Sequence, residues 1–372
     1  MLIDKRLLRN LDYGLAIAVV ISILFGCAMI YSATRFNTRL TQGNPLFYVK
    51  KQLMAAAVGS VVALVALVID YRYYARFATW IYVGCVGMLG SVFLLGTRTK
   101  GAIGWIRLGP LAIQPSEYAK IGVVIALAAY LAEQDDLSTL RSFIVPGLIV
   151  FAPMALVIAE NDLGSALVLA PVFFAMMYAA GANPKVLGLI LAVGLLALAP
   201  AAFFFVLKEH QRLRILVFFN PGMDPRGAGY NVNQSKIAIG SGGLMGKGFG
   251  QSTQARLNFV PEHHTDFIFS VIGEELGFFG AAAALGLLFC IVRRGYRVAT
   301  VARDRFGMLT AVGLTSVILV HVFVNVGMTV NLSPCTGIPL PFFSSGGSSL
   351  MATMLGVAIL ENIHMRRQTV IL

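Results

Sequence analysis

Charge is scarce in this sequence. Only 12% of its 372 residues are Asp, Glu, Lys or Arg, while 58% are hydrophobic. A typical soluble domain has about 25% charged and about 45–50% apolar residues. The shortage of charge therefore excludes an ordinary soluble domain and indicates an integral membrane protein. The net charge of +12 is spread over many segments, so no nucleic-acid-binding tail is predicted.

Cysteine is also scarce. The four cysteines, Cys27, Cys85, Cys290 and Cys335, are far apart and form no CxxC pair. This spacing predicts neither a disulfide framework nor a cysteine zinc site. The first apolar run lacks the A-x-A-like end of a cleaved signal peptide, so we interpret it as a retained helix.

Long apolar runs are abundant and predict an all-α integral membrane protein. Runs of about 18 residues or more mark spanning helices, because lipid offers backbone groups no hydrogen-bonding partner. Ten transmembrane helices are expected, at 13–33, 52–69, 77–97, 115–133, 142–160, 163–182, 186–207, 265–292, 307–330 and 345–365. We interpret residues 1–372 as a single domain with one large extracellular loop, about residues 208–264, between helices 7 and 8.

The orientation follows from Lys and Arg near the helix ends. Ten spans place both termini on the same side, together with the cluster Arg293, Arg294, Arg297, Arg303 and Arg305. Long loops translocate with little regard to charge, so the loop 208–264 is left out of the comparison. The remaining basic residues then favour the side of the termini, which predicts that both termini are cytoplasmic.

Two outer junctions carry acids at helix starts. In "QPSEYAK", Glu117 and Lys120 are three residues apart on one helix face, where they can form an ion pair. Either the pair is structural, or Lys120 and Arg107 hold an anionic substrate. In "AENDLGSALV", Asp162 either caps the next helix or serves the function, and Glu160 is expected to be solvated.

The third outer junction, "PEHHTDFIF", places Asp266 in the first turn of a helix that Thr265 could cap. The helix dipole favours the carboxylate while burial opposes it, and a poorly hydrated carboxylate suits a general base. The alternative is a cap or an ion-pair partner. Glu274 and Glu275 would lie about 12 Å deeper and count as functional candidates. His263 and His264 are interpreted as loop residues rather than metal ligands.

A further segment, "NLSPCTGIPLPFFSSGGSSL", is rich in Pro and Gly and cannot be a regular helix. Non-helical backbone at membrane depth is tolerated where it is buried in protein or lines a cavity. Ser344, Ser345, Ser348 and Ser349 therefore indicate either a cavity wall or a rigid re-entrant turn.

The chain resembles the SEDS family (shape, elongation, division and sporulation) over nearly its whole length. The resemblance is carried by "GWIRLGPLAIQPSEYAK", "DLGSALV", "IAIGSGGLMGKGFGQSTQARLNFVPEHHTDFIFSVIGEELG" and "TGIPLPFFSSGGSS". The stretch "GKGFGQSTQARLNF" and the short amino terminus are closer to the elongation-type branch than to the division-type branch. Three positions depart from the family pattern, namely Gly104, Asn161 and Ser345.

The resemblance implies a peptidoglycan glycosyltransferase that polymerises lipid II on the outer face of the cytoplasmic membrane. It implies a class B penicillin-binding protein and rod-complex membrane proteins as partners, and Mg²⁺ or Mn²⁺ as a divalent cofactor with unassigned ligands. The family's essential aspartate corresponds to Asp266, and its motif residues correspond to Glu117, Lys120 and Asp162.

We therefore expect Asp266 to be the general base toward a sugar hydroxyl, with a polyprenyl pyrophosphate as leaving group. Expected substrate-binding residues are Lys120, Glu117, Arg107, Trp105, Asp162, Lys247 and Ser344. A lipid II flippase is the alternative, although transporters usually place their ionisable groups near the bilayer midplane. A scaffold that only activates its partner is a third possibility, for which Asp266 would be dispensable.

Overall fold

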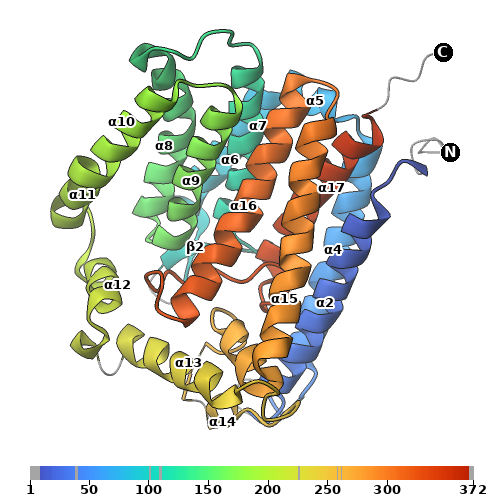
Figure 1. The fold of residues 1–372 in the computed structure, drawn as a ribbon, viewed down its shortest axis with the longest axis vertical. Helices are drawn as coiled ribbons and strands as arrows, with labels where there is room; N and C mark the ends of the chain where they lie inside the picture. Colours follow the sequence, from blue (N-terminus) through green and yellow to red (C-terminus); the bar gives the residue numbers. More distant parts are fainter. Residues whose placement is uncertain are drawn as a thin grey trace.

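Figure 1 shows an upright bundle of helices with both chain ends at one end of the molecule. The computed structural model describes residues 9–37, 41–99, 102–108, 111–224, 227–257, 259–260 and 262–367. We call the end with Arg9 and Arg367 the terminal end. The opposite end, where α13 (Ala228–Gly242) and α14 (Thr253–Arg256) lie, is the loop end.

Helices occupy all ten stretches that the sequence predicts to span a membrane. They are α2 (Tyr13–Thr34), α4 (Phe47–Val68), α6 (Ala78–Leu95), α7 (Pro115–Ala132), α8 (Ile144–Ala159), α9 (Leu163–Ala179), α10 with α11 (Pro184–Val193 and Ala199–Phe205), α15 (Ile268–Val301), α16 (Arg305–Thr329) and α17 (Gly347–Met365). Within the described residues, 7 helices are long and apolar enough to cross a membrane. The protein is therefore a multi-pass membrane protein, and the count of ten crossings stays a prediction.

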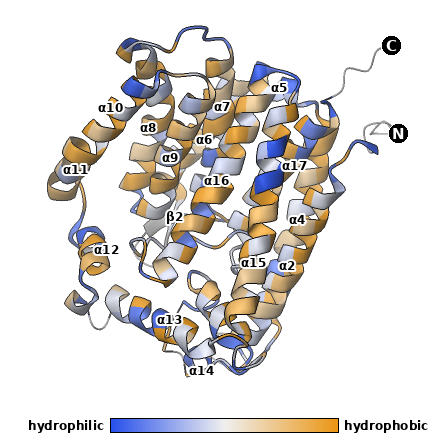
Figure 2. Cartoon of the chain, viewed as in Figure 1, coloured by the Kyte–Doolittle hydropathy of each residue, from blue (hydrophilic) through white to orange (hydrophobic). Residues whose placement is uncertain are grey.

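The helices outside that set of seven include α7 and α17, which carry polar residues into the interior of the bundle. Glu117 and Lys120 of α7 are buried, and so are Ser348, Glu361 and Asn362 of α17. Figure 2 shows apolar residues along the outer helices α8, α10 and α11. The inner helices are less apolar because their polar groups face protein partners rather than lipid.

Shorter elements join the spans. At the terminal end, α5 (Tyr71–Arg76) follows α4, and a 3₁₀ turn, η1 (Leu140–Phe143), precedes α8. A π-helical turn, η2 (Gly194–Leu198), joins α10 to α11. Pi turns inside an α-helix widen it locally, so this span is a helix of three parts.

A small antiparallel sheet departs from the all-α expectation. The strands β1 (Thr97–Thr99), β2 (Ala102–Leu108) and β3 (Leu111–Ile113) pair in the order β1-β2-β3 and lead directly into α7. Trp105 pairs with Thr97, and Arg107 pairs with Ala112. The alternation of "AIGWIRL" suits a strand, and β2 places Gly104 and Arg107 near the start of α7.

The predicted loop 208–264 contains helices of its own. These are α12 (Glu209–Phe219), the 3₁₀ turn η3 (Pro221–Met223), α13 and α14. Ser235 of α13 donates a hydrogen bond to the carbonyl of Thr329 at the end of α16, at 2.8 Å. The loop helix α13 therefore packs against the bundle.

The helix after this loop is interrupted at Gly277. Its φ of 66° and ψ of −159° are not helical, so α15 consists of two helical parts. The Phe278 N–H donates to the carbonyl of Gly243, and the carbonyl of Glu274 accepts from the Lys247 N–H. The segment after α13 thus supplies the backbone hydrogen bonds that the break removes.

Candidate functional site

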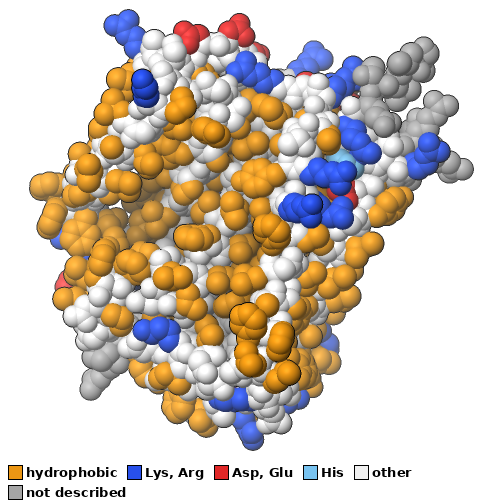
Figure 3. Space-filling view, viewed as in Figure 1, with side chains coloured by type: hydrophobic (Ala, Val, Ile, Leu, Met, Phe, Trp, Pro, Cys, Tyr) orange, Lys and Arg blue, Asp and Glu red, His pale blue; other side chains and the backbone are white. Residues whose placement is uncertain are grey.

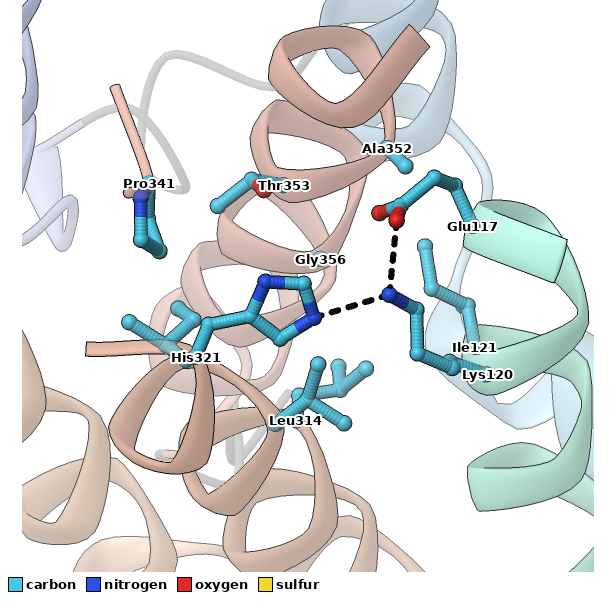
Figure 4. A pocket seen from close by; sticks show the side chains of 11 residues that line it. Glu117, Lys120, Ile121, Leu314, His321, Pro341, Ala352, Thr353 and Gly356 are labelled. Atoms are coloured by element: carbon cyan, nitrogen blue, oxygen red, sulfur yellow. Dashed lines mark hydrogen bonds and ion pairs between the residues drawn. The ribbon is translucent and has the colours of Figure 1, made fainter. Parts of the chain in front are cut away.

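A buried ion pair lies between α7, α16 and α17. Lys120 Nζ is 2.8 Å from Glu117 Oε1, and their side chains are 2% and 5% exposed. The i,i+3 pairing expected from the sequence is confirmed. In Figure 4 the Lys120 ammonium also points to the ring of His321, with Nζ 2.8 Å from Nε2.

His321 completes this cluster and has a defined tautomer. An ammonium group only donates hydrogen bonds, so His321 Nε2 must accept from Lys120. The ring proton therefore sits on Nδ1, and the imidazole is neutral. The adjoining cavity, lined by Glu117, Lys120 and His321 among others, has a volume of about 20 Å³. That is room for about one water molecule, so Lys120 contacts side chains rather than a surface-bound anion in this conformation.

Asp162 confirms the capping interpretation. Its Oδ1 accepts the Ser165 N–H at 3.0 Å at the start of α9. Its Oδ2 accepts hydrogen bonds from the side chains of Gln114 at 2.9 Å and Ser116 at 3.1 Å. One carboxylate thus fixes the start of α9 against the start of α7.

Glu160 is buried, so the expectation of a solvated side chain was wrong. It lies in the turn between α8 and α9, has 0% exposure, and its carboxyl oxygens have no hydrogen-bond partner among the described residues. A Cβ atom on Gly104 of β2 would lie 4.0 Å from Oε2, so the hairpin helps to cover the turn. Burial, with a smaller effect of the Asp162 charge, raises the pKa of Glu160 to about 8.

Asp266 lies in a turn just before α15 rather than in its first helical turn. The helix begins at Ile268 after the N-cap Phe267, which has no side-chain cap. Thr265 does not cap α15; its hydroxyl donates to Glu262 Oε2 at 3.1 Å. The Asp266 side chain is half-buried.

The turn 264–266 is held by three hydrogen bonds to its backbone carbonyls. The Ser345 N–H donates to His264 at 3.0 Å, Ser344 Oγ donates to Thr265 at 2.5 Å, and Asn325 Nδ2 donates to Asp266 at 2.8 Å. Ser344 Oγ also accepts the Leu340 N–H, at 2.8 Å. Ser344 therefore positions the Asp266 turn within a rigid segment.

The Asp266 carboxylate faces the non-helical segment 331–346. A Cβ atom on Gly337, whose φ is +76°, would lie 3.4 Å from Asp266 Oδ2. Burial, and then the charge of Asp266, raise the pKa of the Cys335 thiol to about 11. Glycine at 337 thus allows the strained turn and leaves space beside the carboxylate.

One face of α16 connects the two polar regions. His321 contacts Lys120, while Asn325, one turn later, donates to the carbonyls of Asp266 and Ile338. Four residues advance a helix by about 6 Å. The sequence reasoning missed both residues, although two polar side chains four apart within an apolar span were a usable signal.

Glu274 and Glu275 bond to the segment between α13 and α14 at the loop end. Lys247 Nζ is 2.6 Å from Glu274 Oε1, and Ser252 and Thr253 also donate to Glu274. Glu275 accepts from Ser32 Oγ and the Gly250 N–H. The expected depth of about 12 Å assumed one straight helix, and the break at Gly277 separates these glutamates from the longer part of α15. These carboxylates hold the segment 247–254 in place.

The remaining candidates occupy different surroundings. Trp105 is half-buried on β2, and Arg107 is exposed on the same strand. His263 Nδ1 is 2.6 Å from the Val260 carbonyl oxygen, and the His264 ring lies 4.4 Å from that of Tyr48. Within the described residues, no three His, Cys, Asp or Glu side chains are grouped as metal ligands would be.

Comparison with known proteins defines the class as a polytopic membrane protein of cell-wall synthesis. Residues 13–369 match the family profile of FtsW, RodA and SpoVE, described as "Cell cycle protein". The chain belongs to this family, which is the SEDS family of the sequence analysis.

Similar proteins include peptidoglycan glycosyltransferase MrdB of Escherichia coli K12. It is 35% identical over 359 residues, covering 96% of this chain and 95% of that protein. The probable peptidoglycan glycosyltransferase FtsW of Geobacter metallireducens is 36% identical over 370 residues, covering 98% and 97%.

Solved structures share the fold. The rod shape-determining protein RodA of Thermus thermophilus has a TM-score of 0.72 and 27% identity, covering 96% of this chain and 98% of that one. A chain from a structure titled as a peptidoglycan synthase complex that coordinates polymerization and crosslinking has a TM-score of 0.81 and 29% identity. It covers 96% of this chain and 98% of its own.

Proposed function

We propose that this chain is a peptidoglycan glycosyltransferase that polymerises lipid II on the outer face of the cytoplasmic membrane during cell elongation. The family, the names of its relatives and the placement of Asp266 support this function. In this proposal the chain crosses the membrane ten times, both termini are cytoplasmic, and the loop end is outside.

The observation that carries the mechanism is the anchored Asp266 turn. Three hydrogen bonds fix the carbonyls of residues 264–266, so the half-buried carboxylate is presented from a rigid support. A positioned carboxylate can accept a proton that becomes acidic only in the transition state. Proximity and orientation then compensate for the weak acidity of a sugar hydroxyl.

In the reaction, the acceptor hydroxyl oxygen forms a bond to the anomeric carbon of the donor. The bond from that carbon to the pyrophosphate oxygen breaks, and the pyrophosphate leaves with the electron pair. The hydroxyl proton passes to the Asp266 carboxylate. Direct displacement of this kind inverts the anomeric centre.

Of the three basic candidates, Arg107 is the best placed to stabilise the leaving pyrophosphate. It is exposed on β2, whereas Lys120 is enclosed by Glu117 and His321, and Lys247 is paired with Glu274. A guanidinium group forms paired hydrogen bonds to phosphate oxygens. We propose that Trp105, on the same strand, contacts the substrate beside Arg107. The remaining candidates hold the surrounding helices and turns in place; they are Glu117, Lys120, Asp162, Lys247 and Ser344.

A divalent cation, Mg²⁺ or Mn²⁺, remains part of the proposal without assigned ligands. Asp162 already accepts three hydrogen bonds, and the described residues contain no preformed group of three carboxylate, His or Cys ligands. The side chains alone therefore do not fit a resident ion. Mg²⁺ is commonly held by one or two carboxylates together with substrate phosphates.

We propose a class B penicillin-binding protein as the partner, with rod-complex membrane proteins as further associates. The structural similarity to a chain of a peptidoglycan synthase complex supports an assembly that couples polymerisation to cross-linking. Against the flippase alternative, Glu274 and Glu275 bond to the segment 247–254 at the loop end and so serve the fold rather than transport.

The test is polymerisation of labelled lipid II by the purified protein with its partner. Asp266→Ala and Asp266→Asn should lower the rate by about 10²- to 10⁴-fold, the usual contribution of a general base. Asp135→Asn is the matched control, because Asp135 lies in the loop after α7, is fully exposed, and among the described residues pairs only with Arg305, at 4.0 Å. Its rate should equal that of the wild type.

The assay also separates the alternatives. Polymer formation by Asp266→Ala at the wild-type rate would remove Asp266 as the base and would support a scaffold. A wild-type protein that forms no polymer but moves labelled lipid II across a vesicle membrane would support the flippase.

A further inference from the structure

A basic hollow lies at the terminal end, far from the Asp266 turn. It has a volume of about 490 Å³ and runs along the late part of α15, where its lining includes Phe289, Cys290, Arg293, Arg294, Arg297 and Thr300. Figure 3 shows Lys and Arg side chains gathered at this end of the molecule. Asp12, at the start of α2, binds Arg294 and so places the hollow beside the amino-terminal segment.

The charges in the hollow are not balanced by the protein. Arg294 is paired with Asp12, but Arg293 and Arg297 are exposed and form no ion pair with any described residue. They are four residues apart on one helix face, where like charges repel by a few tenths of a kcal/mol. One oxygen of the nearby buried Glu361 accepts the Asp12 N–H at 3.0 Å, and among the described residues Glu361 forms no ion pair with Arg293 or Arg297. Two guanidinium groups therefore face an open hollow.

The lining changes from apolar to basic along the helix. Phe289 is 68% exposed and precedes the arginines by one turn, whereas Thr300 lies on the terminal side of them. An ordinary soluble anion would use only the basic part. An anionic lipid would use both parts, with its phosphate against the guanidinium groups and its acyl chain along Phe289.

We propose that this hollow binds the phosphate headgroup of an anionic phospholipid in the leaflet at the terminal end. Guanidinium groups form paired hydrogen bonds to phosphate oxygens, and basic pockets at membrane-helix ends suit such headgroups. The bound lipid neutralises the repulsion between Arg293 and Arg297. It also fills the space beside the Asp12–Arg294 pair, which joins α2 to α15.

The test measures lipid retained by the full-length protein. The protein is placed in nanodiscs of phosphatidylcholine alone or of an equal mixture with phosphatidylglycerol, and retained lipid is counted by native mass spectrometry after release. The wild type should keep phosphatidylglycerol in preference to phosphatidylcholine. Arg293→Gln with Arg297→Gln should weaken this retention about thirtyfold, the effect expected for two basic residues at an anionic surface.

The matched control is Arg72→Gln with Arg76→Gln. These arginines are also four apart, exposed and at the terminal end, but they lie on α5 outside the hollow. This control should retain phosphatidylglycerol like the wild type. Arg293→Lys with Arg297→Lys keeps the charge but loses the paired donors, so it should give intermediate retention. This graded result would separate a specific loss of binding from misfolding of the Gln variant.

Three results would overturn the proposal. Equal retention by the wild type and the Arg293/Arg297 double Gln variant would remove the site. An equal loss of phosphatidylglycerol retention in the Arg72/Arg76 control would mean that any basic residue at this end acts in the same way, without a specific site. Displacement of the lipid by millimolar inorganic phosphate, with equal stabilisation of the protein, would assign the hollow to a soluble anion instead.

Discussion

Glu160 and Asp162 are two residues apart, yet their carboxyl groups have opposite surroundings. Asp162 accepts hydrogen bonds from Ser165, Gln114 and Ser116, which stabilise its charged form. Glu160 has 0% exposure and no hydrogen-bond partner among the described residues. A buried carboxyl group without donors is stable only when it is protonated.

The raised pKa of Glu160 predicts that the protein loses stability as the pH rises from about 4.5 to about 8. Its pKa is raised from 4.5 to about 8, so between these values the folded state binds more protons than the unfolded state. Stability therefore falls as the pH rises through this range. At full ionisation the loss is roughly 5 kcal/mol, at about 1.4 kcal/mol per pKa unit.

Glu160→Gln should remove this dependence, because the amide has a similar shape and no charge to bury. The variant should have a higher Tm than the wild type at pH 9 and a similar Tm at pH 5, measured by thermal unfolding in detergent. Asp162→Asn serves as the contrast, because the Asp162 carboxylate already accepts hydrogen bonds. This variant should not have a higher Tm than the wild type at pH 9. Parallel pH profiles for the wild type and Glu160→Gln would contradict the assignment.

At this scale, local spacing predicted local contacts and little else. The Glu117–Lys120 pair and the Asp162 cap follow from separations of three residues in the chain. The contact of Lys120 with His321 joins residues 201 apart, and no pattern in the sequence fixes such a pair. Glu160 was misassigned because its turn is buried by tertiary contacts, among them the approach of the hairpin at Gly104.

Among the elements, α15 shows most clearly where helix patterns fail. The apolar periodicity of 265–292 predicted one continuous span, and the position of the helix was correct. Gly277 within it has positive φ, and the carbonyls of Glu274 and Glu275 bond to the N–H groups of Lys247 and Gly248. A glycine in a helical pattern is usually tolerated as helix, so only the partner segment reveals the break.

The same partner segment gives a prediction for Gly246. Its φ is +79°, and an added Cβ would lie 2.2 Å from the carbonyl oxygen of Glu275. Gly246→Ala must therefore strain the turn and also separate the segment from α15. We expect a loss of stability well above the roughly 1–2 kcal/mol that left-handed backbone alone costs an alanine.

Gly43→Ala isolates the backbone part of that cost. Gly43 has a nearly identical φ of +78°, but no atom of the described residues lies within 4 Å of an added Cβ. Thermal unfolding should show a small decrease in Tm for Gly43→Ala and a clearly larger decrease for Gly246→Ala. Similar decreases for the two variants would mean that the close approach to Glu275 does not matter.

Across the whole molecule, the candidate site and the basic hollow lie toward opposite ends. The anchored Asp266 turn, α13 and α14 lie toward the loop end, while the arginines of the basic hollow lie at the terminal end (Figure 1). The sequence predicted the order and positions of the long helices because each follows an apolar run in the chain. It did not predict that the polar side chains of the inner helices α7 and α17 are buried against other helices rather than facing lipid.

Because the two ends differ in this way, labelling each end can test which one faces outward. If the loop end is extracellular, a membrane-impermeant maleimide should reach it in intact cells. Met245, between α13 and α14, is 79% exposed, and Thr139, in the loop after α7 at the terminal end, is also exposed. In a background lacking the native cysteines, Met245→Cys should be labelled in intact cells and Thr139→Cys only after the cells are permeabilised. Labelling of Thr139→Cys alone in intact cells would reverse the orientation. It would place Asp266 toward the cytoplasm, and polymerisation on the outer face would then be impossible by the mechanism proposed for this site.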